Sequence, residues 1–350
     1  MNANSTAAAY EPDEYITEAS ANTWPGHETK MRAAYYESYG DPSVVEVREI
    51  EKPVPGDNDV LVRVHATIVS AGDTRMRAFD IPALFRLPGR FMLGWPAPKK
   101  PVLGYAYSGI VDSVGKNVAA FRPGDAVLGG HVGGAHAEYN RVPANGPIAK
   151  KPAGLSFETA GTIAFGPSTA LAFLRKAKVG PGTRLLVIGA SGSVGSHAVQ
   201  IARHLGAEVT AVCSGANAEL VTSLGALRIV DYTKEDVREL GEKFDVVFET
   251  IGSMAFADVL PLLAPKGTFV TAVMAPSDIW PAMFAPARKG RKVIAGQVYP
   301  TPAMLSELAG LFASGTLKPV IDSRFTLDTI GYAHARVDTK RKRGDVVVKV

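Results

Sequence analysis

One stretch of this sequence decides the fold: Arg184-Leu185-Leu186-Val187-Ile188-Gly189-Ala190-Ser191-Gly192-Ser193-Val194-Gly195. Residues 185–188 are apolar enough for a buried strand, and apolar residues then recur at helical spacing through Leu205. A glycine-rich turn between a strand and a helix lets the backbone approach a pyrophosphate and aims free helix N–H groups at it. The spacing is G-x-x-G-x-x-G rather than G-x-G-x-x-G, so the flanking strand and helix carry this prediction. The alternative is a purely structural turn of an α/β sheet.

Outward from this turn, strands alternate with helical periods from residue 156 to about residue 300. This alternation predicts a doubly wound parallel sheet of the Rossmann kind. The expected elements are strand 184–188, helix 194–205, strand 208–213, helix 218–224 and strands 228–230, 245–249 and 268–273. The last fifty residues predict a helix over 301–314, a loop, a helix near 327–337 and a strand over 346–350.

The preceding segment, residues 31–155, is β-rich and punctuated by turns. Short strands are expected over 32–36, 60–64, 108–111 and 125–128, with Gly-Asp and Pro-Gly breaks between them. This pattern predicts an all-β, barrel-like domain, and a chain of 350 residues is long enough for two domains. Residues 1–30 are polar, alanine-rich and without period, which favours a flexible solvated tail over a lid or a partner-binding segment.

Composition excludes several classes of protein. Cys213 is the only cysteine, so the chain has no internal disulfide and no multi-cysteine zinc site, and we expect a cytoplasmic protein. The net charge of +4 suits an anionic cofactor but does not by itself point to nucleic acid. The N-terminus lacks the pattern of a signal peptide, and the apolar stretch 256–274 is broken by Pro261, Pro265 and Lys266. We therefore expect no membrane span and no membrane partner.

The strand after the glycine turn bears on the choice of cofactor. In dinucleotide-binding units an acidic residue at the end of that strand holds the ribose 2′-hydroxyl of NAD. Here the strand ends in Cys213-Ser214-Gly215-Ala216-Asn217, with no carboxylate. A 2′-phosphate would meet no repulsion, and Ser214 and Asn217 could donate to it. The sequence therefore favours NADP, although no arginine or lysine stands there to bind the phosphate.

Over residues 31–350 the chain resembles the medium-chain dehydrogenase/reductase superfamily, and within it the zinc-free quinone oxidoreductase and enone reductase branch. The resemblance rests on the glycine turn and on Val60-Leu61-Val62-Arg63-Val64-His65-Ala66, Leu103-Gly104-Tyr105-Ala106-Tyr107-Ser108-Gly109 and Val118-Ala119-Ala120-Phe121-Arg122-Pro123-Gly124-Asp125. It implies a GroES-like catalytic domain over 31–155, a Rossmann domain over 156–300 and a return to the catalytic domain over 301–350. Members of this family are often homodimers.

The resemblance also implies that no catalytic zinc is bound. The positions that hold a Cys, a His and a second Cys in zinc members fall at Ser70, Tyr105 and Phe165 of this chain. None of these side chains is a competent zinc ligand, and Asp73 alone would leave the ion underbound. The hydroxyl that relays the alcohol proton in zinc members would fall at Gly72, which has no side chain.

Zinc-free relatives deliver hydride to the β-carbon of an enone or to a quinone, and this chemistry needs a hydrogen-bond donor for the developing oxyanion. Tyr105 is the first candidate donor and Ser70 the second, with Asp73 as an orienting or structural carboxylate. A tyrosine that merely packs under the site is an open alternative. A backbone N–H or the nicotinamide ribose could also supply the donor.

Further cofactor contacts follow from the resemblance and from the position of strand ends. Thr169 matches a residue that faces the nicotinamide, although Ser168 or Thr169 could simply cap a helix. Tyr232 matches a residue near the adenosine phosphate, or is a strand-end tyrosine. Lys340 matches a basic residue that reaches the cofactor, or begins a solvated run of charges. The crevice at the strand ends is expected to include Thr250, Ile251, Gly252 and Val273, together with Gly189, Ser191, Gly192, Ser193, Val194 and Gly195 of the turn.

The apolar loop over 79–95 borders the active site in the family, so it favours a bulky or apolar substrate; Trp280, Met283 and Phe284 are further candidates for the same lining. A surface loop packed on its own core is the alternative.

Our first hypothesis is an NADPH-dependent reductase of enones or quinones. The second is a carbonyl reductase or a dedicated biosynthetic reductase. The third is an NADPH-binding protein with little catalysis, whose basic C-terminal run contacts RNA or a protein.

Overall fold

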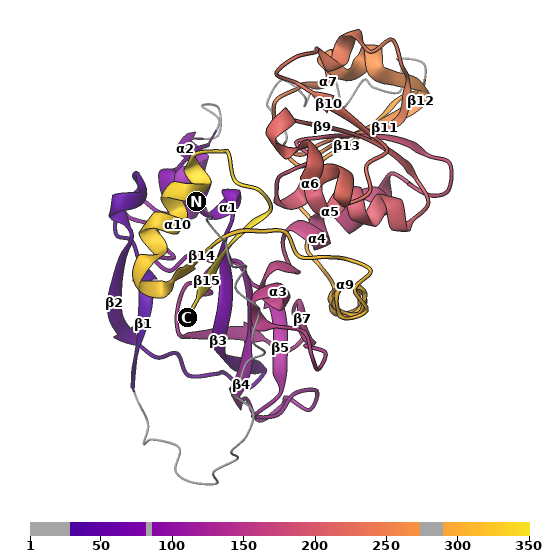
Figure 1. Ribbon diagram of the computed structural model, residues 1–350. Helices are drawn as coiled ribbons and strands as arrows, with labels where there is room; N and C mark the ends of the chain where they lie inside the picture. Colours follow the sequence, from indigo (N-terminus) through magenta and orange to yellow (C-terminus); the bar gives the residue numbers. More distant parts are fainter. Residues whose placement is uncertain (1–28, 82–85, 274–289) are drawn as a thin grey trace, which may run out of the picture.

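The computed structural model describes residues 29–81, 86–273 and 290–350, and shows two lobes, each built around its own large sheet (Figure 1). The expected tail, residues 82–85 of the apolar loop, and Trp280, Met283 and Phe284 lie outside the described residues. Among the described residues, no helix has both the length and the apolar character needed to cross a bilayer.

The upper lobe in Figure 1 contains a six-stranded parallel sheet in the order β10-β9-β8-β11-β12-β13. Its strands are β8 Arg184–Ile188, β9 Glu208–Cys213, β10 Arg228–Asp231, β11 Phe244–Glu249, β12 Leu263–Thr271 and β13 Lys292–Ile294. This is the Rossmann order, in which the chain reverses direction beside the first strand. The predicted doubly wound sheet is confirmed, and the predicted bounds of β8 and β9 agree with the structure residue for residue.

The other lobe contains a seven-stranded, largely antiparallel sheet in the order β14-β15-β3-β4-β5-β7, with β6 paired to β3. Its strands are β3 Asp59–Val69, β4 Ala106–Val114, β5 Ala126–Gly130, β6 Tyr139–Pro143, β7 Ile148–Lys150, β14 Ile321–Thr326 and β15 Asp345–Lys349. A two-stranded sheet of β1 Lys30–Tyr35 and β2 Glu46–Glu51 lies beside it. The GroES-like fold expected for this lobe is confirmed, and the C-terminal strand returns to it.

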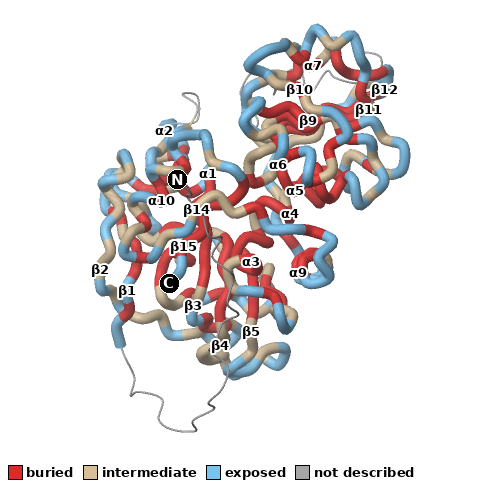
Figure 2. The backbone as a smooth tube through the Cα atoms, viewed as in Figure 1, coloured by how far each residue is buried: buried red, intermediate tan, exposed pale blue. Residues whose placement is uncertain are grey.

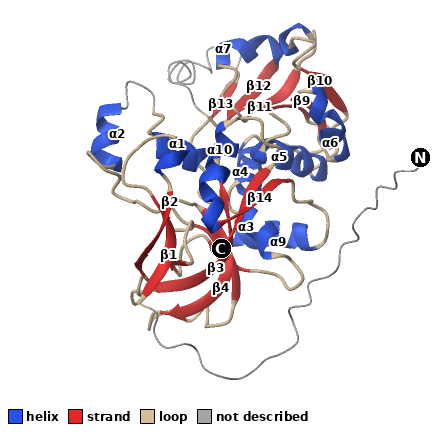
Figure 3. Ribbon diagram, turned by 60° about the vertical axis from the view of Figure 1, so that its left-hand side comes forward, coloured by secondary structure: helices blue, strands red, loops and turns tan. Residues whose placement is uncertain are grey.

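Helices cover both sheets and fill the region between them (Figure 3). They are α1 Ala71–Ala78, α2 Arg86–Leu93, α3 Phe157–Thr162, α4 Gly166–Lys176, α5 Ser193–His204, α6 Ala218–Ser223, α7 Phe256–Val259, α9 Pro302–Ala313 and α10 Ile330–Asp338. Short 3-10 turns are η1 Pro42–Val44, η3 Gly215–Asn217, η4 Val237–Glu239, η5 Leu260–Leu262 and η7 Leu327–Thr329.

One buried core joins the two lobes. It runs from Ala66 and Ala106 of the antiparallel sheet through Ala164 and Leu171 to Val187 of the parallel sheet. Figure 2 shows the buried segments of both lobes approaching each other along α4 and α5. Apolar burial is the main stabilising term in folding, so this shared core holds the lobes in one arrangement.

Three sequence-based expectations about local structure were wrong. The loop expected after residue 314 contains strand β14, whose partner is β15. The all-β expectation for residues 31–155 missed α1 and α2, and α2 replaces part of the expected apolar loop. The helix expected near 327–337 starts as the 3-10 turn η7 and becomes α-helical only at Ile330. In each case a tertiary contact or a capping residue determines the secondary structure, which local periodicity alone does not specify.

Candidate active site

The glycine turn has a conformation and a packing that require glycine. Gly189 has φ +79°, in the left-handed region, and a Cβ there would lie 2.6 Å from Ile251 Cγ2 and 2.7 Å from Thr250 Oγ1. A Cβ on Gly195 would overlap the carbonyl oxygen of Gly189. A Cβ on Gly192 would lie 3.5 Å from that same oxygen, an ordinary contact. Gly189 and Gly195 therefore hold the strand and helix together, while Gly192 leaves its own side of the turn open.

The first turn of α5 offers donors for an anion. Gly192 caps this helix without a side chain, and the first N–H groups of any helix lack partners inside it. Ser191, Gly192 and Val194 are partly exposed, whereas Ser193 and Gly195 are buried. The Ser193 hydroxyl donates to Asp345 Oδ1, so Ser193 can offer an incoming pyrophosphate only its backbone. This cradle fits a dinucleotide.

The ends of the neighbouring strands complete the same edge of the sheet. The Thr250 hydroxyl donates to the Ile188 carbonyl at 2.7 Å, and a Cβ on Gly252 would lie 3.0 Å from Val273 Cγ1. The turn after β11 is built on Glu249, which is buried and accepts the N–H groups of Ile251, Gly252 and Ser253. Burial raises the pKa of Glu249 above its ordinary value. The structure therefore brings Thr250, Ile251, Gly252 and Val273 to the glycine turn.

The predicted adenosine end also gathers in one place. Asn217 Nδ2 donates to Ser191 Oγ at 3.0 Å, and the Tyr232 amide donates to the Cys213 carbonyl, next to Ser214. Asp231 adds a carboxylate that the sequence analysis of this site overlooked, since it comes from the next strand and reaches Gly215. Its hydrogen bonds from the Thr233 hydroxyl and amide lower its pKa, so it is already partnered and ionised.

Residues 213–217 contain no basic side chain, and the C-terminal segment supplies one. Arg343 NH2 donates to the Ala216 carbonyl at 3.2 Å, across 127 positions of sequence. The expected basic residue, Lys340, lies instead at the end of α10, where its amide donates to the Val337 carbonyl. Lys342 turns inward and donates to the Gly344 carbonyl at 2.5 Å, and burial lowers its pKa. The charged run is therefore not a uniformly solvated face.

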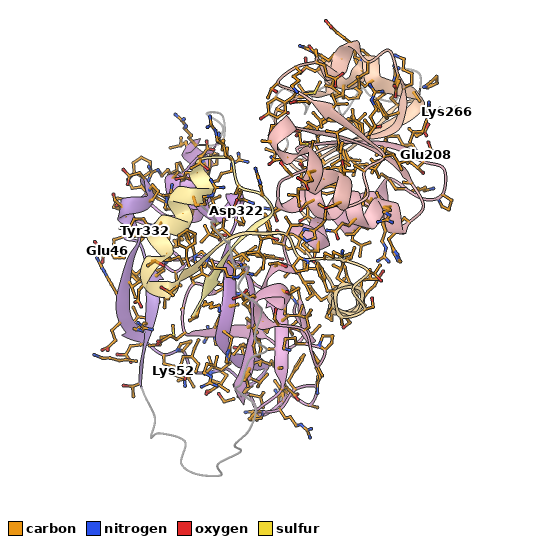
Figure 4. All side chains as sticks on the ribbon, in the orientation of Figure 1. Glu46, Lys52, Glu208, Lys266, Asp322 and Tyr332 are labelled. Atoms are coloured by element: carbon orange, nitrogen blue, oxygen red, sulfur yellow. The ribbon has the colours of Figure 1, made fainter. Side chains whose placement is uncertain are left out.

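Asp322 holds this basic segment in place. It lies on β14, labelled in Figure 4, and it accepts the Arg343 amide at 2.7 Å and the Arg336 guanidinium at 2.7 and 2.8 Å. Burial opposes its ionisation, but these hydrogen bonds lower the pKa of Asp322 to about 2. The carboxylate therefore stays charged throughout the physiological range and fixes the backbone from which the Arg343 side chain reaches Ala216.

Thr169 lies on the first turn of α4, next to the glycine turn. A Cβ on Gly166 would overlap Ser193 Oγ, which shows how closely α4 approaches α5. The helix begins after Phe165 with no side-chain cap, and the Ser168 hydroxyl donates to the Ile163 carbonyl, so the capping alternative was wrong. The Thr169 hydroxyl has no hydrogen bond to any described residue and is free to contact a ligand.

Tyr105 presents an unused donor. Its hydroxyl is buried and has no hydrogen-bond partner among the described residues, and its ring lies against Gly130, where a Cβ would be 2.7 Å from Cε1. Burial raises the pKa of Tyr105 to about 12. Tyr105 also packs on the core that the two lobes share. A buried phenol without a partner costs free energy, so its retention is consistent with a donor kept for a ligand.

Ser70 and Asp73 are engaged with each other. Both are buried, the Ser70 hydroxyl donates to Asp73 Oδ2 at 2.6 Å, and the two residues form the capping box of α1. Asp73 Oδ1 accepts the Gly104 amide at 3.1 Å, directly before Tyr105. The geometry therefore makes Asp73 a residue that positions the Tyr105 backbone, and it leaves the Ser70 hydroxyl without a free proton to donate.

Comparison with known proteins places the chain among dehydrogenases and reductases. Residues 56–153 match the family model described as an alcohol dehydrogenase GroES-like domain, and residues 224–348 match that of a zinc-binding dehydrogenase. The 2-methylene-furan-3-one reductase of Solanum lycopersicum is 30% identical, over 99% of this chain and 84% of its own. The chloroplastic NADPH-dependent alkenal/one oxidoreductase of Arabidopsis thaliana is 29% identical, over 91% and 79%. The solved quinone oxidoreductase of Coxiella burnetii superposes with a TM-score of 0.81 at 26% identity, over 92% and 99%.

Substitutions of Gly195 and Gly192 distinguish a glycine needed for packing from a glycine needed for the approach of a ligand. We expect Gly195→Ala to lower the melting temperature, because the new methyl group overlaps the Gly189 carbonyl and α5 must move away from β8. Gly192→Ala should leave the melting temperature within about 2 °C of wild type and should weaken dinucleotide binding about ten-fold or more, since a methyl group then stands where the phosphates approach. Thermal unfolding and titration calorimetry test both. Equal losses of stability in the two variants would contradict this division of roles.

Proposed function

We propose that this chain, which belongs to the medium-chain dehydrogenase/reductase family, transfers hydride from NADPH to the activated double bond of an enone, or to a quinone, without a metal ion. The observation that carries the proposal is the buried, unpartnered hydroxyl of Tyr105, at the position where zinc members hold a ligand. The relatives named above act on such substrates by name, and one of them is NADPH-dependent by name. A homodimer and a cytoplasmic location are part of the proposal.

The side chains at the family's zinc-ligand positions support a reaction without zinc. Ser70, Tyr105 and Phe165 stand at the family's ligand positions, and the Ser70 hydroxyl is committed to Asp73. Within residues 29–81, 86–273 and 290–350, no three His, Cys, Asp or Glu side chains come together as a metal-binding group. Zinc requires nitrogen, thiolate or carboxylate ligands, so polarisation of the substrate oxygen falls to a hydrogen-bond donor.

The residues around the glycine turn fit NADPH, which supplies the hydride when bound. The first N–H groups of α5 bind the pyrophosphate, and Ser191 and Asn217 offer hydroxyl and amide donors next to it. Arg343 would neutralise the 2′-phosphate, which would favour NADPH over NADH. The free hydroxyl of Thr169 would orient the nicotinamide end.

Tyr105 acts on the substrate. Its O–H donates to the carbonyl oxygen of the enone, which takes up the electron pair released as hydride arrives at the β-carbon. Because the pKa of Tyr105 is raised to about 12, the phenol keeps its proton and acts as a donor rather than as a base at neutral pH. The α-carbon then takes a proton from solvent, which completes the saturated ketone. Asp73 positions this tyrosine through the Gly104 amide.

The arrangement of the basic segment disfavours the RNA-binding hypothesis. Lys342 donates to a carbonyl of its own segment and burial lowers its pKa, so one of the four charges in this run is withdrawn from solvent, and Arg343, although exposed, donates to the Ala216 carbonyl. A surface that binds nucleic acid by its phosphates needs its cations available to solvent. The same contacts favour a role in cofactor binding.

Substitution of Arg343 tests the assignment of the cofactor. Arg343→Gln should raise the KM for NADPH about ten-fold or more and leave the KM for NADH within two-fold, since about 1.5–3 kcal/mol of charge-assisted hydrogen bonding to the phosphate is lost. Arg341→Gln is the matched control, because it removes an exposed arginine of the same run. Steady-state kinetics with both cofactors measure the effect. A KM for NADPH unchanged by Arg343→Gln would refute the role of this arginine.

Substitution of Tyr105 tests the donor. Tyr105→Phe should lower kcat about 100-fold with little change in the KM for NADPH, since the donor acts on the developing charge. Tyr107→Phe is the matched control, because the Tyr107 hydroxyl is also buried and unpartnered but lies in the core of the antiparallel sheet.

The pH profile supplies a second readout for the same residue. Because the raised pKa keeps the phenol protonated, the wild-type rate should show no loss from Tyr105 near pH 10 and should fall only as the pH approaches about 12. A rate unchanged in Tyr105→Phe at all pH values would remove the phenol from the mechanism.

A further inference from the structure

An exposed apolar patch lies at the edge of the antiparallel lobe, on α2 and the segments beside it. Leu87, Phe91, Met92 and Trp95 are 62, 70, 75 and 65% exposed, and Val132 is 42% exposed. Figure 3 shows that α2 projects from the body of the lobe beside α1. Single exposed apolar side chains are ordinary on protein surfaces, but a contiguous group of large ones marks an interaction site. We call these five residues the apolar patch.

Basic side chains surround the apolar patch without acidic neighbours in sequence. Between Asp80 and Asp112 the charged residues are Arg86, Arg90, Lys99 and Lys100. None of the four forms an ion pair with any described residue. Asp80, the acidic residue that precedes them, pairs with Arg75 at 3.5 Å. The four cations are therefore not neutralised within the described part of the chain.

Three of these cations are held at the patch by direct contacts. The Arg90 guanidinium lies 5.9 Å from the ring centroid of Trp95 in the patch, and 4.2 and 4.6 Å from those of Phe79 and Tyr39 beside it. Lys99 Nζ donates to the Phe91 carbonyl at 2.7 Å, and Lys100 Nζ donates to the Val132 carbonyl at 3.0 Å. These contacts place positive charge at the rim of an apolar, aromatic surface.

We propose that the apolar patch docks on an anionic lipid bilayer. Phenylalanine, leucine and tryptophan insert into the interfacial region of a bilayer, while arginine and lysine beside them meet anionic headgroups. A symmetric dimer formed through this patch would place its cations against the same cations of the second copy, which opposes that occupant. Docking of this kind is peripheral and needs no membrane-spanning helix, so the proposal departs from the sequence-based expectation of no membrane partner but not from that of no membrane span.

A pocket beside the apolar patch could take up a substrate from the bilayer, an inference that rests on the proposed function. An apolar pocket of about 190 Å³ adjoins the patch and is lined by Tyr36, Tyr39, Met76, Met92, Leu93 and Val132, with Lys99 and Lys100 at its wall. Val132 follows Gly130 by two residues, and the Tyr105 ring lies against Gly130. Tyr105 does not line this pocket, and the proposal is that a quinone or enone dissolved in the bilayer enters the protein here.

Vesicle flotation of the purified full chain, without cofactor or substrate, tests the docking. We expect binding to phosphatidylcholine vesicles that contain phosphatidylserine, weaker binding to phosphatidylcholine alone, and release by salt. Lys99→Glu with Lys100→Glu should lower the partition coefficient at least about 25-fold, since each cation near an anionic surface contributes a factor of about five. Lys178→Glu with Lys292→Glu makes the same change in net charge at exposed sites elsewhere and should have little effect. Equal losses in the two double variants would overturn the proposal.

The apolar contribution is tested in the same assay. Phe91→Ser with Met92→Ser should lower the partition coefficient at least about ten-fold, whereas Leu227→Ser, at a residue 76% exposed on the other lobe, should not. Brominated lipids should quench wild-type tryptophan fluorescence, and Trp95→Phe should remove most of that quenching. This measurement on the wild-type fold holds even if a patch variant folds poorly.

Three further outcomes would overturn the proposal: no flotation with anionic vesicles, flotation that all patch variants retain, or a patch variant that changes the oligomeric state, which would assign the patch to a second copy. Since the assay contains neither cofactor nor substrate, inactivity toward enones and quinones would refute the proposed function and leave the docking result standing.

Discussion

The structure depends on the contact between the C-terminal strand of one sheet and the glycine turn of the other. The Gly344 amide donates to the Ser191 carbonyl at 2.8 Å, and Asp345, buried at the start of β15, accepts the Ser193 hydroxyl. These bonds connect a strand that pairs with β3 to the first turn of the helix that faces the cofactor. Together with the shared apolar core, they fix the distance between the cofactor cradle and Tyr105. The same segment brings Arg343 to Ala216, so the cofactor recognition that we propose uses both lobes.

In the proposed function, a single buried hydroxyl takes the place of a metal ion. A hydrogen bond in a site from which water is excluded is stronger than the same bond in water, because the local dielectric constant is low. The unpartnered phenol destabilises the free protein. The packing of the Tyr105 ring on Gly130 and on the shared core offsets this loss of stability. Asp73 holds the backbone beside that ring, in keeping with the orienting role expected of it, and it engages the hydroxyl of Ser70, the second candidate donor.

Local sequence predicted the parts of the fold that local forces decide. The apolar run of β8 and the glycines after it specify a strand, a tight turn and a helix, and the bounds of β8 and β9 could be predicted residue by residue. β14 could not, because its residues are only half-buried and its stability comes from pairing with β15. Arg343 could not be told apart from Lys340 within one basic run, since only the fold brings one of them to Ala216, 127 positions away. The unpartnered state of the Tyr105 hydroxyl is likewise a property of packing, which no spacing of residues reveals.

The central claim is that this chain moves hydride from NADPH to a carbon–carbon double bond with a hydrogen-bond donor in place of a metal ion. The most direct measurement follows deuterium from NADPH labelled at the transferred position into an enone, with enzyme dialysed exhaustively against a chelator. The account predicts full activity after dialysis, with the label on the β-carbon of a saturated ketone. Label on the carbonyl carbon of an allylic alcohol, or activity lost on dialysis and restored by zinc, would contradict it.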